Sequence, residues 1–318
     1  MKKEIFMKKI GFVIMLMLLV VLTACTKDSQ DTFDEKSNIT IYTRDTTSGT
    51  RDGFMNGIGF QEAAKSDDVL VEGFVIKDNT AILNAMTIDH YGIGYVSLSS
   101  VNDEVKGLSF EGVAPSEANV MNNTYGLKRP FNWMIRADGD FPSTEVEALV
   151  KAFVAFLGTT DAADIINNAG AIALSTTTTW DSIKANHPIT SQDNSSLTVR
   201  FGGSDSIQKV AEALTQAFSA KAGDFVAEHD HTGSGDGWKR TNGDTKDQTV
   251  GKDVGFASRV FTTSELSNAD ESQYGQLAWD AIVVIVHTNN PITNMTADTL
   301  KKIYEGTYTT WSDVTSLD

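Results

Sequence analysis

Cysteine, proline and positive charge are all scarce in this sequence. Its 318 residues include one cysteine and five prolines. The single cysteine excludes a disulfide framework and a site made of several thiolates, and so few prolines argue against a disordered chain. With 41% hydrophobic residues, the chain can build cores in two lobes or in one large α/β unit.

Negative charge dominates the composition. Lysine and arginine number 26 against 42 aspartates and glutamates, which gives a net charge of -16. This excess disfavours broad binding to nucleic acid or to an anionic membrane surface. An anionic ligand would need local attraction, which can succeed because bulk charge is screened beyond about 8–10 Å at physiological salt.

One long apolar run, Ile10–Leu22, follows four lysines among residues 2–9. It is shorter than the roughly 20 apolar residues of a membrane-spanning helix, so it predicts a secretory signal. The run ends in Leu-Thr-Ala-Cys at residues 22–25, which resembles the bacterial lipobox. That resemblance implies a lipoprotein signal peptide over residues 1–24, lipidation of Cys25 and a body on the extracytoplasmic face of the cell membrane. An uncleaved anchor helix from Ile10 is the alternative.

Residues 25–36 are polar and acidic without periodicity, which predicts a flexible tether between lipid and domain. Removal of residues 1–24, with four lysines and one glutamate, changes the net charge from -16 to -19. We therefore expect the mature protein to be a very acidic body.

Short β-rich runs alternate with helical patterns through the rest of the chain. Strands are predicted at 39–42, 69–76, 93–98, 197–201, 225–229, 254–256 and 281–287. A helix over 206–218 has an apolar face at the 3.6-residue period and could be capped by Asp205 or Ser206. A second helix over 143–157 carries Thr144 and Glu147 at capping-box spacing. The alternation predicts α/β layers.

The stretch Ser175–Ser196 differs in composition from its surroundings. It is rich in Thr, Ser, Asn and Asp and contains Pro188. These features predict a surface linker.

A polar turn follows the first strand. The segment Arg44–Thr50 leads into a helix, so the Ser48 and Thr50 hydroxyls would lie beside the free amides of a helix N-terminus, a geometry that binds oxyanions. Gly49 allows close approach of the backbone. The Arg44 guanidinium offers a charged fork for a tetrahedral anion.

Three further turns place hydroxyls after strands. Their hydroxyl and charged residues are Ser204, Asp205, Ser206, Ser234, Ser258 and Arg259. Each turn alone is more often an ordinary helix cap. Four such turns in one exported α/β chain favour an oxyanion site.

Other chemistry has weaker support. His229 and His231, with Glu228, Asp230 and Asp236 close by, could bind a metal ion because alternate residues of a strand share a side. No third histidine is near in sequence, however, and a polar strand end is the commoner explanation. No nucleophile elbow or P-loop is present. The sequence therefore predicts a binding protein without enzymatic activity, metal or cofactor.

Together the turns resemble the phosphate-binding protein of the phosphate ABC importer. That family's GS-x-S turn, GSG turn, SR pair and R-x-x-x-SGT motif are matched at 203–206, 233–235, 258–259 and 44–50. Supporting segments match at 93–96, 125–130, 280–291, 300–306 and 311–314. The resemblance covers nearly all of residues 39–314. It implies the two-lobe, type II periplasmic-binding-protein fold, an α/β architecture.

The motifs stand in an unusual order. In the usual family chain the GS-x-S turn comes first and W-x-D-V precedes R-x-x-x-SGT, whereas here Arg44 comes first and Trp311 last. Joining the end of the chain to residues 37–39 restores the usual order, so the chain resembles a circular permutant whose old ends met in 175–196. The implied lobes are residues 94–287, and residues 37–93 plus 288–318.

The resemblance implies extracytoplasmic capture of inorganic phosphate by a monomer and its delivery to the permease subunits of an ABC importer. The phosphate-binding residues would be Arg44, Ser48, Gly49, Thr50, Ser204, Asp205, Ser206, Ser234, Ser258 and Arg259. The phosphate proton needs a buried acceptor, for which Asp45 and Asp205 are the candidates. The alternatives are binding of sulfate, molybdate or tungstate, and a phosphate-sensing or adhesion role without transport.

Overall fold

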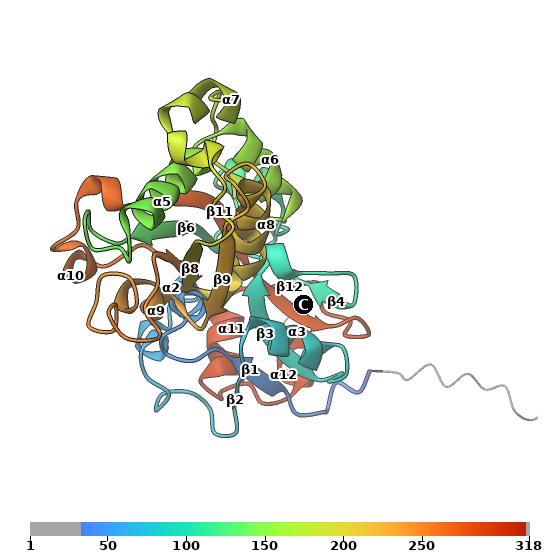
Figure 1. Ribbon diagram of the computed structural model, residues 1–318. Coiled ribbons are helices and arrows are strands. Elements are labelled where there is room, and N and C mark those ends of the chain that lie inside the picture. The colour runs from blue at the N-terminus through green and yellow to red at the C-terminus, as the bar shows by residue number, and fades with distance from the viewer. Residues whose placement is uncertain (1–32, 316–318) are drawn as a thin grey trace, which may run out of the picture. The chain divides into compact units, whose positions relative to one another are not determined.

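The fold is organised around one long strand, β11 (Tyr274–His287). Within residues 33–315, which the computed structural model describes, ten strands form one sheet. Its order is β2-β1-β3-β11-β6-β10-β8-β9, and β4 and β7 pair with β11 outside this path. The first part of β11 pairs antiparallel with β6 and its last part with β3 (Figure 1). The predicted signal peptide and Cys25 lie outside the described residues.

The pairing of β11 divides the sheet into two parts, which we call the β1 half and the β8 half. The β1 half contains β1 (Thr40–Thr43), β2 (Val75–Ile76), β3 (Gly92–Ser97), β4 (Val105–Gly107), α2 (Gly49–Gly57), α3 (Asn79–Met86), α4 (Glu117–Met121), α11 (Ala297–Tyr304), α12 (Trp311–Thr315) and the small sheet of β5 (Ser109–Phe110) with β12 (Asn294–Met295). The β8 half contains β6 (Lys128–Ile135), β7 (Ile172–Ala173), β8 (Thr198–Gly203), β9 (Val226–His231), β10 (Val254–Ala257), α5 (Thr144–Leu157), α6 (Thr160–Asn168), α7 (Trp180–Ile183), α8 (Gln208–Ser219), α9 (Ser234–Lys239) and α10 (Thr263–Leu266).

Each half has its own hydrophobic core. In the β8 half, α5 and α8 pack on the sheet through residues such as Phe153 and Phe218, whose rings lie 5.6 Å apart. In the β1 half, α3 packs on the sheet through Ile82 and its neighbours. Strand β11 contributes Leu277 and Ala278 to the first core, and Val283 and Ile285 to the second. The predicted α/β layers are confirmed.

The chain passes between the halves at two places that lie side by side. One is β11 itself, and the other is the segment before β6, where Leu127 O accepts a hydrogen bond from Ile282 N at 2.9 Å. Strand β3 runs through the predicted boundary between residues 93 and 94. The segment after it also joins the β1 half, since Leu108 N donates to Val284 O. The division into lobes at the predicted boundaries stays a prediction.

Most predicted strands are present, but the first turn of the 206–218 helix differs from the prediction. That segment begins with a 3-10 turn, η5 (Asp205–Ile207), before α8, and neither Asp205 nor Ser206 caps the helix with its side chain. The capping prediction is wrong because the Asp205 carboxylate is held by groups of the β1 half. The predicted strand over 69–76 is also wrong in length, since only Val75–Ile76 is extended.

Helix α5 begins one residue later than predicted and uses another cap. The Ser143 hydroxyl accepts from Val146 N at 3.2 Å, so Ser143 rather than Thr144 is the N-cap. Glu147, the expected partner of a capping box, instead accepts from Gly139 N. A serine one position earlier satisfies the same free amides, so the capping box predicted from the spacing of Thr144 and Glu147 is not formed.

The stretch 175–196 is more structured than a surface linker. It contains α7 and two 3-10 turns, Lys184–Asn186 and Pro188–Ser191. The side chains of Trp180, Ile189 and Asn194 are buried. Trp180 packs edge-on against Phe218 of α8. The linker prediction is wrong here because two apolar side chains among the polar ones fix the stretch to the core of the β8 half.

Residues 37–39 and 309–311, near the two ends of the described chain, lie next to each other. Ile39 N donates to Thr309 O at 2.8 Å, and Trp311 N donates to Ser37 O at 3.2 Å. No helix among residues 33–315 has the length and apolar character that crossing a membrane requires.

Candidate functional site

The first part of the candidate site is the turn between β1 and α2. Ser48 is the N-cap of α2, and its hydroxyl accepts hydrogen bonds from Thr50 N at 3.2 Å and Arg51 N at 3.4 Å. Ser48 has an extended backbone, so the chain enters the helix with its first amides directed at the turn. Both Ser48 and Thr50 are buried.

The β8 half supplies three serines from the ends of three parallel strands. Strand β8 pairs in parallel with both β9 and β10, so the residues that follow them meet at one edge of the sheet. Ser204 Oγ donates to Ser258 Oγ at 2.9 Å, and the Ser234 and Ser258 hydroxyls lie 3.1 Å apart. Ser258 N donates to Ser234 Oγ at 2.9 Å.

The two halves meet at these hydroxyls. The Thr50 and Ser206 hydroxyls lie 2.7 Å apart. A Cβ at Gly49 would overlap the Ser234 hydroxyl and lie 2.7 Å from that of Ser258, so only glycine fits between the halves. The members of this hydroxyl cluster are Thr50, Ser204, Ser206, Ser234 and Ser258, and all are buried.

A buried ion pair adjoins the hydroxyl cluster. The Arg44 guanidinium is 1% exposed, and its Nη2 donates to both carboxylate oxygens of Asp205, at 2.7 and 2.6 Å. Nη1 of Arg44 lies 3.3 Å from the Thr50 hydroxyl, and its Nε has no hydrogen-bond partner among the described residues. The Asp205 carboxylate also accepts from Asn79 N at 3.2 Å. A carboxylate of the chain is therefore held by an arginine fork and a helix amide, the groups that bind oxyanions.

Two predicted site residues have side chains that bond to groups other than the cluster. The Asp45 carboxylate accepts hydrogen bonds from the backbone amide and hydroxyl of Thr47, within its own turn. The Arg259 guanidinium forms a two-bond ion pair with Glu265, at 2.7 and 2.8 Å. Hydrogen bonding to Glu265 raises the pKa of Arg259 above its ordinary value. Both side chains are engaged locally.

Sequence reasoning missed Asn79, which brings the first amide of α3 to the Asp205 carboxylate. The available signal was Asp78, which caps α3 through a 2.7 Å bond from Ala81 N. Its position before the apolar residues of this helix marks a helix start. Its proximity to residue 205 comes only from the tertiary fold.

The two histidines of β9 are in contact with each other. His229 Nδ1 lies 3.0 Å from His231 Nε2, and His231 Nδ1 lies 3.1 Å from Ser204 O. Burial lowers the pKa of His231 to about 4 and also lowers that of His229, so both rings are neutral at pH 7. No set of three histidine, cysteine or acidic side chains within residues 33–315 is arranged to hold a metal ion.

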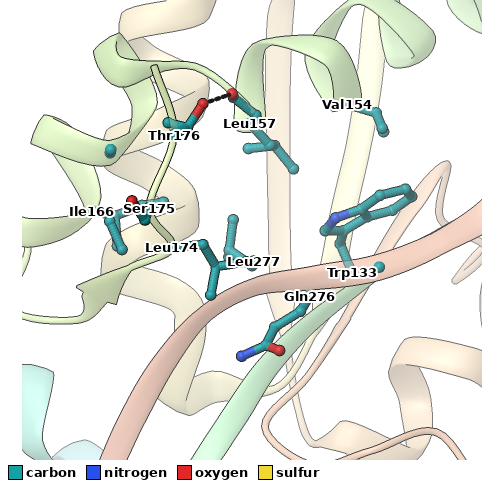
Figure 2. Close-up of a pocket in the computed structure, with 13 residues that line it drawn as sticks. Trp133, Val154, Leu157, Ile166, Leu174, Ser175, Thr176, Gln276 and Leu277 are labelled. Carbon is teal, nitrogen blue, oxygen red and sulfur yellow. Dashed lines mark hydrogen bonds between the residues drawn. The ribbon is translucent and has the colours of Figure 1, made fainter. Parts of the chain in front are cut away.

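Two cavities differ in their relation to the cluster. A cavity of about 360 Å³ lies beside Asp205 and Asn79, between α3 and α8, and is lined mainly by polar side chains. Another, of about 320 Å³, lies within the β8 half (Figure 2). Trp133, Leu157 and Leu277 line the second cavity, near the 2.8 Å hydrogen bond from Thr176 to Gly158 O. It contains no residue of the hydroxyl cluster.

Known proteins are similar to this chain in sequence and in architecture. A family model described as a PBP superfamily domain matches residues 188–318. The phosphate-binding protein PstS 2 of Streptococcus agalactiae serotype V is 26% identical over 306 residues, which cover 94% of this chain and 94% of the relative. The protein of the same name from Streptococcus pneumoniae serotype 4 is 27% identical over 299 residues, covering 92% of this chain and 94% of the relative.

A solved structure is similar as well. The phosphate-binding protein of a phosphate ABC transporter from Streptococcus pneumoniae TIGR4 matches with a TM-score of 0.62 and 26% identity, over 87% of this chain and 100% of that chain. The predicted resemblance to phosphate-binding proteins is confirmed. The chain has the type II periplasmic-binding-protein fold, with the hydroxyl cluster where its two halves meet.

Proposed function

We propose that this protein captures inorganic phosphate outside the cell and delivers it to an ABC importer. One observation carries the proposal: hydroxyls from both halves of the sheet and the Arg44 guanidinium converge in a single buried cluster. Hydroxyls and amides of fixed orientation can replace the water shell of a tetrahedral anion. Such binding needs no covalent step, cofactor or metal ion.

Phosphate would be enclosed by movement of two lobes about the β11 crossing. The hydrogen bonds that join the halves at the site are few and local, such as Thr50 to Ser206 and Arg44 to Asp205. Opening therefore breaks these contacts without disturbing either core. We place the crossings near Leu127 and near Ile282, where the pairing partner of β11 changes from β6 to β3.

Asp205 is the better of the two candidates for accepting the phosphate proton. Its carboxylate is bonded to Arg44, which also contacts the Thr50 hydroxyl of the cluster, whereas that of Asp45 is bonded to Thr47. A carboxylate accepts a hydrogen bond from hydrogen phosphate but repels sulfate, which carries no proton at neutral pH. Asp205 would thus favour phosphate over sulfate, molybdate and tungstate.

The proposed location rests on the lysines, the apolar run and the cysteine among residues 1–25. Residues 1–24 would be a signal peptide, and Cys25 would carry the lipid that holds a monomeric protein at the outer face of the membrane. The importer would supply the permease subunits and the energy for transport, since the sequence has no P-loop. Catalysis has no part in this proposal.

We also propose that the chain order is a circular permutation. The contacts between residues 37–39 and 309–311 support this, because they show that the proposed joint needs little added chain. The match to the superfamily model begins at residue 188, inside the stretch 175–196 where the old ends would have met.

Calorimetric titration of residues 26–318 with phosphate, sulfate and molybdate tests the function, after unfolding and refolding to remove carried-over ligand. We expect one-to-one binding of phosphate, weakened at least 100-fold by Arg44→Ala because a buried charged hydrogen-bond partner of the anion is lost. The control Arg240→Ala removes an ion-paired arginine on the β8 half, whose partners are Asp230 and Asp236. Folded protein that binds none of the three anions would leave a sensing or adhesion role.

A further inference from the structure

A second buried arginine lies at the crossing between the halves. Arg129, near the start of β6, is 4% exposed and stands opposite Asp280 in the pairing with β11. Its Nε donates to Asp280 Oδ2 at 2.9 Å, and its Nη2 lies 2.8 Å from the same oxygen. The other carboxylate oxygen, Oδ1, accepts from the Ser97 hydroxyl of β3 at 2.8 Å. The Nε side of Arg129 is thus fixed by strands of both halves.

The other side of this guanidinium is unsatisfied. Within the described chain, Nη1 of Arg129 is buried and has no hydrogen-bond partner, whereas Nη2 is in ion-pair contact with Asp280. Arg51, which is just as buried, shows the contrasting case. Its guanidinium donates to Arg44 O, Ala63 O, Ser66 O and the Asp67 carboxylate. A buried cation with unused donors is costly unless a ligand supplies acceptors.

These unused donors lie close to the proposed phosphate site. Gly49 and Gly53 are one turn apart on the same face of α2, about 6 Å along the helix at 1.5 Å per residue. Gly49 faces Ser234 and Ser258, and a Cβ at Gly53 would lie 3.8 Å from Arg129 Cδ. Burial lowers the pKa of Arg129, and the charges of Asp280, Arg44 and Asp205 also act on it. Arg129 therefore lies beside Gly53, one helical turn along α2 from the glycine that contacts the hydroxyl cluster.

The two arginines have complementary free donors. Arg44 uses Nη1 and Nη2 and leaves Nε free, whereas Arg129 contacts Asp280 through Nε and Nη2 and leaves Nη1 free. The positive charge of Arg44 is already matched by Asp205. The charge of Arg129 is likewise matched by Asp280, so what Arg129 would add for a tetrahedral anion in the cluster is an unused hydrogen-bond donor.

We propose that Arg129 is a second arginine of the oxyanion site, which donates to tetrahedral anions such as hydrogen phosphate through its free Nη1. Asp280 and Ser97 act as positioning residues, because they hold Arg129 by its Nε side. This inference rests on the proposed function. It adds a residue from the crossing to a site otherwise built from four turns.

Titration of residues 26–318 with inorganic phosphate tests the role of Arg129. Loss of the arginine alone would leave Asp280 buried without its partner, so the main variant is Arg129→Gln with Asp280→Asn, a neutral pair of similar shape. We expect the Kd for phosphate to rise at least tenfold, because the free Nη1 donor is lost while the net charge of the pair stays at zero. Arg129→Lys, which retains the charge, should recover most of the lost affinity.

The matched control is Arg200→Gln with Asp253→Asn. Arg200, the third residue of β8, pairs with the buried Asp253 at 2.7 Å. The Kd of this control variant for phosphate should stay within twofold of the Kd of the unchanged protein. An unchanged Kd in the folded Arg129 and Asp280 variant would overturn the inference, as would an equal loss in Arg129→Lys. Failure of the original protein to bind phosphate would instead reject the proposed function.

Discussion

Gly49 shows how much of the site depends on one missing side chain. A Cβ here would overlap the Ser234 hydroxyl, so Gly49→Ala should keep the two halves apart. We expect a loss of phosphate affinity of at least tenfold with little change in the melting temperature, because the clash arises at the contact between halves and outside both cores. Titration and calorimetry measure the two effects. Gly158→Ala is the control, because a Cβ there meets only ordinary contacts. Gly59→Ala is unsuitable, since the φ of Gly59 is +72°.

Asp205 sets the expected selectivity. Asp205→Asn replaces the acceptor of the phosphate proton with an amide that can also donate, so phosphate affinity should fall and sulfate affinity should rise. Titration with both anions measures the ratio of the two Kd values. Asp45→Asn is the matched control, since Asp45 bonds within its own turn. A change in selectivity with Asp45→Asn alone would return the acceptor role to that residue.

His231 gives the protein a pH dependence of known sign. Its pKa is lowered by burial to about 4, below the unfolded value of about 6.5, so the neutral ring stabilises the fold at neutral pH. This contribution is lost as the pH falls from about 6.5 to 4, and we expect about 1–2 kcal/mol after allowance for partial exposure. Urea unfolding at several pH values should show that the free energy of unfolding falls less steeply with falling pH in His231→Gln than in the unchanged protein. If His231→Gln left the pH dependence of stability unchanged, His231 would not be its source.

At the scale of residues, sequence reasoning identified the turns better than the contacts of individual side chains. Strand ends and glycine turns predicted where Ser204, Ser234 and Ser258 stand, because parallel strands bring their ends together. The partners of Asp205 and the local bonds of Asp45 and Arg259 depend on distances between segments far apart in the chain. Periodicity and spacing carry no information about such distances.

The elements were predicted where apolar periodicity is strong, as in α5 and α8, and missed where it is weak. Strands β5, β7 and β12 have two residues each, too few for a periodic pattern. The stretch 175–196 was misjudged because its composition is polar on average, although Trp180 and Ile189 are buried. A few anchoring side chains decide whether such a segment packs on the core.

Trp180 is therefore the residue to change in that stretch. It packs against Phe156 and Phe218, so Trp180→Ala should cost about 3–5 kcal/mol of unfolding free energy. Phosphate affinity should be unchanged, since the hydroxyl cluster is elsewhere. Denaturant unfolding and phosphate titration provide the two measurements. The exposed Thr177→Ala serves as a control, and equal stability of the two variants would support the original linker prediction.

For the whole molecule, the adjacency of the two ends makes chain order testable. A rearranged gene would begin at residue 186, continue to 315, and join 35–185 through a short Gly/Ser linker. The new ends, Ala185 and Asn186, are exposed, and Thr315 already contacts Glu35 through its hydroxyl at 3.2 Å. We expect this chain to fold and to bind phosphate within about threefold of the original, since exposed sites tolerate such cuts. Failure to fold would show that the present order is required.

Strand β11 has a consequence for how this molecule loses its structure. Its fourteen residues form one continuous element, and its two ends belong to different cores. Melting of either core pulls apart a strand that the other core also needs, so heat should give a single cooperative calorimetric transition in place of two. As the proposed hinge, β11 would let the two halves rotate relative to each other and would not let either half unfold alone.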